Sequence, residues 1–561
     1  MQRRIQARAP ALYPLAGIVL GLVVAAHLHP PPALLLAGAL AATMLALKLC
    51  TAFPRRFTVA WALAYIAAAT LAAWTYGIIR LPETPPPEQL ALPERETTLE
   101  FQVQRIFQEK DSFGRTSGIA RLIADPEIGP LRKGRKLYFS VKYDALPHGP
   151  PRPGIELEAT GVLYPVPAPD PGRSKAGLDA FNAYLKETGT HYRFARCSEL
   201  RVIRPPSLFQ RFCGRMNRRF HDTLRLGAPA DKDLDNIYVA MLLGRKNSLT
   251  SEQKERFQLS GTMHFFAISG LHIGVIAAVI AQALLLLRVP RAISPFIGLP
   301  LLFAYVVITG SSPSAIRAFL MATFFWAAYA LKRQRGPLPA LAGSAVFVLL
   351  IAPEQLRSIG FQLSYAVVLS ILLLGLPLYE VLTERFRPGQ WTPEKDRSKL
   401  QRCQAWSVDK LLLLFAISFS AWVASTPLSA GLFNYVAPGA ALLNMALINL
   451  AGLTIITGVS GLAVGTVFLG PLAAFLNHAA WVLIIVMDAV ISFSTQLPGA
   501  IIRSENFPLS LSYASLTLYF ALLFGLHVSS KPFTVARLCI APAIILALTA
   551  AGLLTTEASS L

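Results

Sequence analysis

Long runs of apolar residues recur along the sequence and limit what it can fold into. Three runs near the start, at 11–29, 31–50 and 57–80, are long enough for a helix to cross the hydrocarbon core of a bilayer. Ten further runs lie near 263–287, 293–309, 313–331, 337–352, 359–383, 411–433, 440–469, 472–497, 509–527 and 536–555. The pattern predicts a polytopic α-helical membrane protein with about 11–13 transmembrane helices. The run at 440–469 is long and rich in glycine, and a broken helix is one alternative there.

The composition agrees with a chain that lies mostly in a bilayer. Hydrophobic residues make up 54% and charged residues 15%, whereas about 25% charged residues is usual for a soluble domain. The formal net charge is +21. Cytoplasmic loops of membrane proteins collect Lys and Arg, and a positive charge also suits a polyanionic partner.

The basic loops predict the orientation. Arg3, Arg4 and Arg8 precede the first apolar run, which we interpret as a transmembrane helix because no small-residue cleavage site follows it. With the N-terminus in the cytoplasm, the basic loops near 288–291 and 332–335 also fall inside. The segment between the third and fourth spans is then extracytoplasmic.

That segment, from 81 to about 205, has no long apolar run. Five strand-like runs occur at 97–106, 118–123, 136–143, 155–164 and 191–203, and 175–188 has helical spacing. Five short strands and one helix predict a small closed barrel of the OB-like type. An unspecialised β-domain is the alternative.

Short helices are predicted between this domain and the remaining spans. In the segment 207–226, apolar residues lie on one face of the predicted helix and arginines on the rest, as in a helix that lies on a membrane surface. Leu234, Ile237 and Met241 share the stripe of a second amphipathic helix. Thr250 and Gln253 form a capping-box pattern that opens a third.

Metal, nucleotide and disulfide signals are few. No CxxC pair or other metal-ligand spacing and no Gly-rich phosphate loop occurs, so we expect no metal, no ATP and no other cofactor. Cys197 and Cys213 share the soluble region, and a disulfide between them requires an oxidising compartment.

Polar residues inside the apolar runs are costly and usually face a protein interior or a water-filled path. Seven of them are candidates to line a channel: His264, Ser269, His272, Arg317, Gln362, Asn434 and Asn444. Several fall toward the outer ends of their helices, which predicts one outward-facing vestibule. For each residue a structural role is the alternative; Arg317, for example, lies near a helix end and could extend to the interface.

Ser269 and His272 also raise the alternative of an intramembrane hydrolase. They lie three residues apart and therefore share a helix face. Side chains at that spacing rarely place a hydroxyl in line with an imidazole, and no third orienting group is identifiable. We therefore expect no catalytic residues in this chain.

Four motifs in one order are similar to those of a known family: GRKNSLTSEQKERFQLSGTMHFFAISGLHIG (244–274), SPSAIRAFLM (312–321), GFQLSYA (360–366) and STPLSAGLFNYVAPGAALLNM (425–445). Together they resemble the ComEC competence proteins, which internalise DNA in natural transformation, and AISGLH is the most specific element. AGLDAFNAYLKETG (176–189) is similar to a helix of that family's external OB-like domain. The resemblance extends from the first spans to about residue 530.

The resemblance implies a channel that takes one DNA strand across the bacterial cytoplasmic (inner) membrane. The domains it implies are N-terminal transmembrane helices (1–80), an extracytoplasmic OB-like domain (81–205), amphipathic interfacial helices (206–260) and a competence-type transmembrane channel domain (261–555).

Single strands bind positive grooves that carry aromatic side chains. The candidate DNA-binding residues of the OB-like domain are Arg132, Lys133, Arg135, Lys136 and Tyr138. A solvated turn explains this basic run equally well.

Many members of the family carry a C-terminal metallo-β-lactamase-like nuclease domain, whose HxHxDH motif is absent from this sequence. We therefore expect no nuclease activity from this chain. The partners that the resemblance implies are single-stranded DNA, the lipid bilayer, a separate nuclease, a DNA receptor and a cytoplasmic DNA translocase, and a homodimer is left open. The alternative is a transporter or flippase of another anionic substrate.

Overall fold

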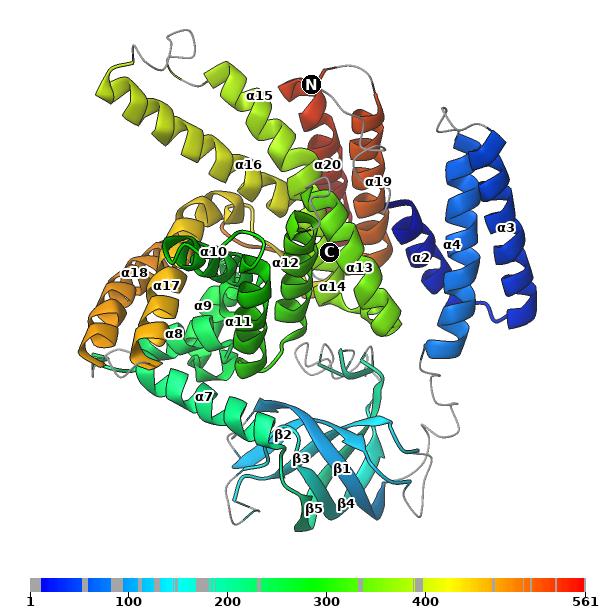
Figure 1. Cartoon of the computed structure of the whole chain (residues 1–561), viewed down its shortest axis with the longest axis vertical. Coiled ribbons are helices and arrows are strands. Elements are labelled where there is room, and N and C mark those ends of the chain that lie inside the picture. Colours follow the sequence, from blue (N-terminus) through cyan, green and yellow to red (C-terminus); the bar gives the residue numbers. More distant parts are fainter. Residues whose placement is uncertain are drawn as a thin grey trace. The chain divides into compact units, whose positions relative to one another are not determined.

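The computed structural model shows a helical bundle and a small β-barrel (Figure 1). It describes residues 12–52, 59–81, 94–108, 113–125, 132–144, 146, 150–167, 181–182, 184–186, 188–229, 234–330, 336–386, 388, 397–466, 470–497, 499–504, 507–529 and 532–558. Two compact units divide these residues. The barrel unit comprises 13–218 and 347–359, and the bundle unit comprises 219–346 and 360–561 together with the residues up to 12.

The barrel unit begins with three apolar helices, α2 (Leu12–Ala25), α3 (Pro32–Ala52) and α4 (Val59–Arg80). Glycine lets α2 and α4 pack backbone to backbone: a Cβ atom on Gly21 would lie 2.3 Å from the carbonyl oxygen of Thr70. Close packing of small residues is how apolar helices associate where lipid supplies no hydrophobic driving force.

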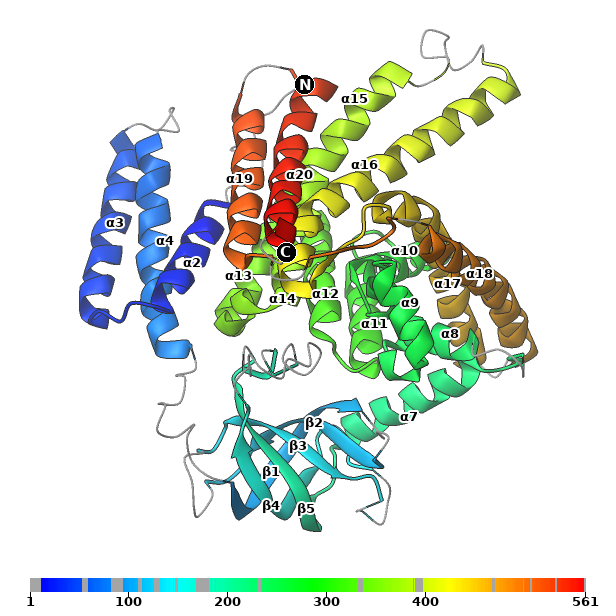
Figure 2. The same cartoon turned by 180° about the vertical axis from the view of Figure 1, so that it is seen from behind.

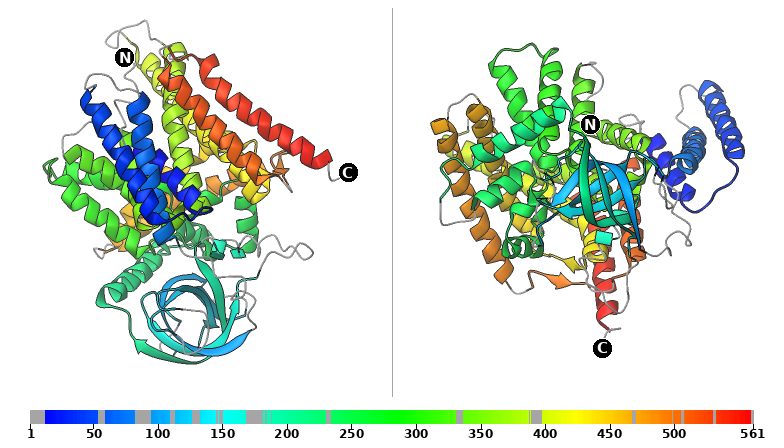
Figure 3. Two further views of the ribbon diagram at one scale, coloured as in Figure 1. Left: turned by 90° about the vertical axis from the view of Figure 1, so that its right-hand side faces the viewer. Right: turned by 90° about the horizontal axis from the view of Figure 1, so that it is seen from below.

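The β-barrel consists of β1 (Arg95–Gln108), β2 (Arg115–Leu122), β3 (Lys136–Lys142), β4 (Glu156–Pro165) and β5 (Thr190–Arg204). The strand order is β1-β2-β3-β5-β4, and β1 pairs with β4 to close the ring (Figure 3, left). Only β3 and β5 run parallel among these pairs. The predicted OB-like barrel is thus confirmed as a closed five-stranded barrel.

Every second side chain of the strands points into the barrel, where these mostly apolar side chains form its core. Leu99, Phe101 and Val103 of β1 point inward with Leu137 and Phe139 of β3, and all five are buried. Period-two alternation produces this result because successive side chains of a strand point to opposite faces. Of the predicted helix at 175–188, residues 181–182 and 184–186 are helical, and 175–180 lie outside the described residues.

α7 (Leu208–Leu224) follows the barrel, and α8 (Leu234–Leu243) and α9 (Ser251–Leu259) follow α7. Leu208, Phe209 and Phe212 of α7 are exposed, as the prediction of an interfacial helix requires. The predicted capping box is present, since the Thr250 hydroxyl accepts the Gln253 N–H at the start of α9.

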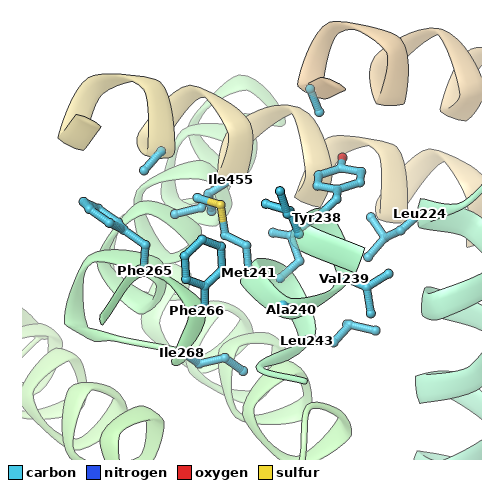
Figure 4. Packing of buried hydrophobic residues seen from close by; sticks show 14 of the residues in the cluster. Leu224, Tyr238, Val239, Ala240, Met241, Leu243, Phe265, Phe266, Ile268 and Ile455 are labelled. Carbon is cyan, nitrogen blue, oxygen red and sulfur yellow. The ribbon is translucent and has the colours of Figure 1, made fainter. Parts of the chain in front are cut away.

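α8 differs from the prediction of an amphipathic interfacial helix. Eight of its ten residues are buried, and the helix lies at the centre of the bundle core (Figure 4). The face opposite the predicted stripe carries Val239, Ala240 and Leu243, so the helix is apolar on every side. A helix of that kind is buried rather than interfacial.

The remaining helices complete the bundle. They are α10 (Gly270–Leu286), α11 (Ser294–Ile308), α12 (Pro313–Ala330), α13 (Pro337–Ile351), α14 (Ile359–Ser370), α15 (Leu376–Phe386), α16 (Lys399–Phe433), α17 (Ala440–Thr466), α18 (Gly470–Gln496), α19 (Leu509–Val528) and α20 (Val535–Ala558). Two short strands, β6 (Tyr435–Val436) and β7 (Ile502–Arg503), form a separate antiparallel pair.

Among the described residues, eight helices are long and apolar enough to cross a membrane, and shorter apolar helices of 10–17 residues accompany them. The prediction of a polytopic membrane protein is confirmed. The predicted count of 11–13 spans includes segments that form these shorter helices.

Of the alternatives left open for the run 440–469, the structure shows the unbroken helix. α17 is one continuous helix that lies beside α18 (Figure 2). Its glycines serve packing: a Cβ atom on Gly458 would lie 2.2 Å from Leu242 and 2.9 Å from the Tyr238 hydroxyl. The irregular segment lies elsewhere, because α14 continues into a π-helical turn, Ile371–Gly375, and then into α15. Pro377 follows that turn, and proline cannot donate the regular backbone hydrogen bond of an α-helix.

Candidate functional site

The predicted DNA-binding residues lie on the hairpin of β2 and β3. Arg132 and Lys133 are exposed in its turn, where Gly134 has a φ of +86°. The Arg135 N–H donates to the Arg132 carbonyl at 3.1 Å. Lys136 begins β3; its Nζ lies 3.7 Å from the Glu354 carboxylate.

The strand register adds basic residues that sequence reasoning missed. Arg115 lies opposite Lys142, and Arg121 lies opposite Lys136, on the outer face of the hairpin. Like charges directly opposite each other destabilise a sheet. Lys136 has a counter-charge in Glu354, and the concentration of positive charge on this face suits an external anion. Only the register of β2 and β3 could have revealed these pairs.

Tyr138 is packed against the protein. Its ring centroid lies 5.5 Å from that of Phe181 and 6.4 Å from that of Phe107, and the Arg193 guanidinium lies 5.3 Å from it. These contacts hold the helical residues near 181–186 on the outside of β3. The stacking of a base on Tyr138 stays a prediction.

An exposed aromatic residue lies just before the β2–β3 hairpin. Phe113, just before β2, is 82% exposed, and Arg115 follows two residues later. Exposed aromatic rings beside positive charge are what single strands stack on. Phe113 lies in a loop without a periodic hydrophobic pattern, so the sequence did not indicate that its ring is exposed.

Titratable groups within the barrel are held neutral. Cys197 and Cys213 are free thiols, so the predicted disulfide is not formed. Burial raises the pKa of the Cys197 thiol to about 12 and also raises the pKa of Cys213. Burial lowers the pKa of His191 below its usual 6.5, and the positive charges of Arg135 and Lys186 add to this shift.

In the bundle, HFFAISGLHIG is not the start of a continuous helix. Met263–Phe266 form a 3-10 turn, Ser269 is extended, and α10 begins at Gly270. Ser269 is the N-cap of α10, and His272 reaches back to it: its Nδ1 accepts the Ser269 N–H at 3.3 Å. Their pattern is a capping box with histidine in the place of Glu or Gln.

The same turn brings the Ser269 hydroxyl to the imidazole, a contact that side chains three residues apart rarely make. Ser269 Oγ lies 2.9 Å from His272 Nδ1, because Ser269 lies outside the helix and its side chain is free to turn back. His272 is 0% exposed, and its Nε2 has no hydrogen-bond partner among the described residues. The helix cap explains the contact without any catalytic role.

Arg317 lies in the second turn of α12 and is 4% exposed. Its Nη2 donates to the Gly360 carbonyl at 2.8 Å, while Nε and Nη1 have no partner within the described part of the chain. The side chain does not extend to an interface; it is buried against the first turn of α14.

α14 carries further polar contacts beyond Gly360, to helices on different sides of it, and we name this set of contacts the polar seam. Gln362 Oε1 accepts the hydroxyl of Tyr513 on α19 at 2.9 Å, and Tyr365 Oη lies 3.2 Å from Ser344 Oγ on α13. Ser370 Oγ lies 2.7 Å from Tyr519 Oη. From 360 to 370 the seam rises about 15 Å along the helix, roughly half of a hydrocarbon core.

The other channel-lining candidates lie apart from Arg317. His264 is exposed beside Phe265, and its Nδ1 lies 3.0 Å from the Gly261 carbonyl oxygen. Asn434 is the exposed C-cap of α16 with a φ of +59°, a conformation that asparagine tolerates. Asn444 on α17 has a buried Oδ1 without a partner among the described residues. Arg317 contacts the first turn of α14, the turn that also carries Gln362.

Asn477 is a residue that sequence reasoning missed. It is 0% exposed on α18, and its Nδ2 donates to the carbonyls of Thr223 at 2.8 Å and Leu226 at 3.3 Å. Its Oδ1 accepts the Tyr238 hydroxyl at 3.3 Å. It therefore satisfies carbonyls at the end of α7 from a distant part of the chain.

The comparisons with known proteins concern this bundle. The Competence protein family model matches residues 241–530. The chain is 28% identical to ComE operon protein 3 of Bacillus subtilis (strain 168) over 232 residues. The aligned segment covers 41% of this chain and 29% of that protein. Over 147 residues it is 31% identical to an uncharacterized protein of Aquifex aeolicus (strain VF5), covering 26% of this chain and 34% of that protein.

The chain thus spans about a third of the length of each of these relatives. No solved structure matches it. The family model covers more than half of the chain and includes Ser269, His272, Arg317 and the polar seam. This multi-pass membrane protein therefore belongs to the ComEC-type family of competence proteins.

Proposed function

We propose that this protein forms a channel for single-stranded DNA across the bacterial inner membrane during natural transformation. Its N-terminus is cytoplasmic and its barrel extracytoplasmic in this proposal, as the basic loops indicate. The observation that carries the proposal is the polar seam within the family-matched bundle, headed by a buried arginine. A phosphate chain needs polar groups along its path, and apolar helices without them offer no such path.

The barrel supplies the complementary feature. Its β2–β3 hairpin places basic residues opposite one another, and Phe113 is exposed nearby. In the proposal the barrel retains the incoming strand outside the membrane, and the seam contacts it during passage. A DNA receptor, a separate nuclease and a cytoplasmic translocase would act before and after this step, and a homodimer is one arrangement of the channel.

Uptake of labelled DNA tests the proposal. Deleting the gene should abolish the internalised, nuclease-resistant label while DNA bound at the cell surface remains. Complementation with the full chain should restore uptake. Unchanged internalisation in the deletion strain would refute the channel proposal.

Transport of a smaller anion is the second candidate, because the N–H groups of Arg317 suit a carboxylate or a phosphate equally well. Purified full-length protein in liposomes separates the two candidates. Flux of a small organic anion without any passage of an oligonucleotide would favour the transporter.

The intramembrane hydrolase is the third candidate, favoured by the 2.9 Å contact of Ser269 with His272. Substituting Ser269→Ala should leave DNA uptake near the wild-type level, since loss of an N-cap costs only about 1 kcal/mol of stability. Ser364→Ala, at a half-buried serine of α14, is the matched control. Loss of a hydrolytic activity in Ser269→Ala alone would support the hydrolase instead.

A further inference from the structure

Arg317 is a charged group that its surroundings leave incompletely paired. The guanidinium has five N–H donors. One donates to the Gly360 carbonyl, while Nε and Nη1 have no partner among the described residues. No described carboxylate forms an ion pair with it.

Such an arrangement is costly for the fold. Burying an ion costs several kcal/mol unless good partners compensate, and the Gly360 carbonyl is a neutral partner. An apolar side chain of similar length would fill the same place on α12 at less cost. An arginine that is retained at such a cost suits a ligand that supplies the missing partners.

The helix that Arg317 contacts, α14, carries hydroxyl and amide groups rather than carboxylates in its first two turns. Tyr365 interacts electrostatically with the guanidinium, and its hydroxyl lies 3.2 Å from Ser344 Oγ. Gln362, on the same turn of α14, holds the Tyr513 hydroxyl. The first turn of α14 adds the partial positive charge of a helix N-terminus. Together these groups suit an anion that can also accept hydrogen bonds.

We propose that Arg317 is the phosphate-binding residue of the bundle, which takes one phosphodiester of the passing strand through the N–H groups of Nε and Nη1. This inference rests on the proposed channel function. Arginine suits phosphate because its planar donors match the phosphate oxygens in geometry and charge. Since the side chain is only 4% exposed, the phosphate reaches it when the contact between α12 and the first turn of α14 opens.

Arg317→Met tests the proposal, because it removes the charge and retains most of the side-chain volume. Uptake of labelled DNA should fall about 10- to 100-fold, the loss expected for charge-assisted hydrogen bonds. The Tm of the purified full chain in lipid nanodiscs should stay unchanged or rise, because an unpaired buried charge has been removed. Arg291→Met, at an exposed arginine between α10 and α11, is the matched control and should leave both measurements unchanged.

Arg317→Lys refines the test. Lysine keeps the charge and loses the planar fork, so uptake should lie between those of the wild type and Arg317→Met. Arg317→Met with wild-type uptake overturns the proposal. So does a variant that loses both uptake and several degrees of Tm, because Arg317 is then a structural residue. In either case the channel proposal stands if gene deletion still abolishes uptake, and it fails separately if deletion has no effect.

Discussion

The β2–β3 hairpin of the barrel and the α12–α14 contact of the bundle both hold positive charge. On the hairpin, Arg121 faces Lys136, whose charge Glu354 partly offsets, and both side chains have access to water. Like charges directly opposite each other cost about 0.2–1 kcal/mol. Arg317 is buried without a counter-charge among the described residues, and such burial costs several kcal/mol. The barrel would thus hold an anion through many weak interactions with exposed charges, and the bundle through one strong interaction with a buried charge.

Replacing Asn477 by leucine tests whether a buried polar side chain with hydrogen-bond partners stabilises the fold, whereas one without partners does not. Asn477→Leu leaves the Thr223 and Leu226 carbonyls and the Tyr238 hydroxyl without their partner. The free energy of unfolding should fall by about 2–4 kcal/mol, since each buried unsatisfied group costs about 1–3 kcal/mol. Thermal unfolding of the full chain in nanodiscs measures the loss.

The matched control for that substitution is Asn444→Leu, because the Asn444 Oδ1 is buried without a described partner. It should leave the Tm unchanged or raise it. If Asn444→Leu destabilised the protein as much as Asn477→Leu, the distinction between paired and unpaired polar groups would not hold in the bundle.

Phe113→Ala tests the barrel side of the comparison. If the exposed ring stacks on a base, binding of a short oligothymidylate should weaken by about 1–3 kcal/mol, or about 5- to 150-fold in Kd. Ile203→Ala, at a half-exposed apolar residue on β5, should leave Kd unchanged. Fluorescence anisotropy with the full chain measures both, and equal affinities would remove Phe113 from the DNA interface.

Arg121→Thr sharpens the comparison, because it should affect stability and binding in opposite directions. Removing the like charge opposite Lys136 should raise the free energy of unfolding by about 0.2–1 kcal/mol. Oligonucleotide binding should become less dependent on salt, by about 0.7 in the slope of log K against log salt for one lost phosphate contact. Arg201→Thr is the contrasting variant, since Arg201 lies opposite Glu158 and its loss should destabilise the barrel.

The smallest effect that we expect is a dependence of barrel stability on pH, which arises from His191. Burial and the charges of Arg135 and Lys186 lower its pKa in the folded protein below 6.5. The unfolded chain therefore binds the proton more readily, and stability falls as the pH drops below about 6.5. Unfolding of the wild type and of His191→Gln at pH 5 and pH 8 measures this. The pH-dependent difference should be smaller in the variant, and equal differences would assign the pH response to another group.

Sequence patterns predicted most of the fold, because alternation and apolar length are local signals. The five strands of the barrel were identified to within a few residues, and the Thr250 capping box was read from two residues. The pattern misled at α8, where one apolar stripe was interpreted as an amphipathic helix although Val239, Ala240 and Leu243 on the other side are also apolar and buried. It also misplaced the irregular segment, because the π-helical turn before Pro377 depends on tertiary packing against α16.

The candidate site was predictable only in part. Arg317 and Gln362 were identified as costly residues in apolar segments, and Arg317 contacts the first turn of α14, which carries Gln362. The facing charges of Arg115 and Lys142 depend on strand register, which no single strand reveals. The contact of Ser269 with His272 depends on where the helix begins, and helix boundaries are the weakest part of a pattern-based prediction.

The burial of α8 has a consequence for how the protein is made. Tyr238 hydrogen-bonds to Asn477, which follows it by 239 residues. At 5–20 residues per second, a ribosome needs about 10 to 50 seconds to cover that interval. Throughout that time α8, which is buried in the finished core, has no α17 or α18 to pack against. The centre of the bundle is therefore completed only when helices from late in the sequence emerge.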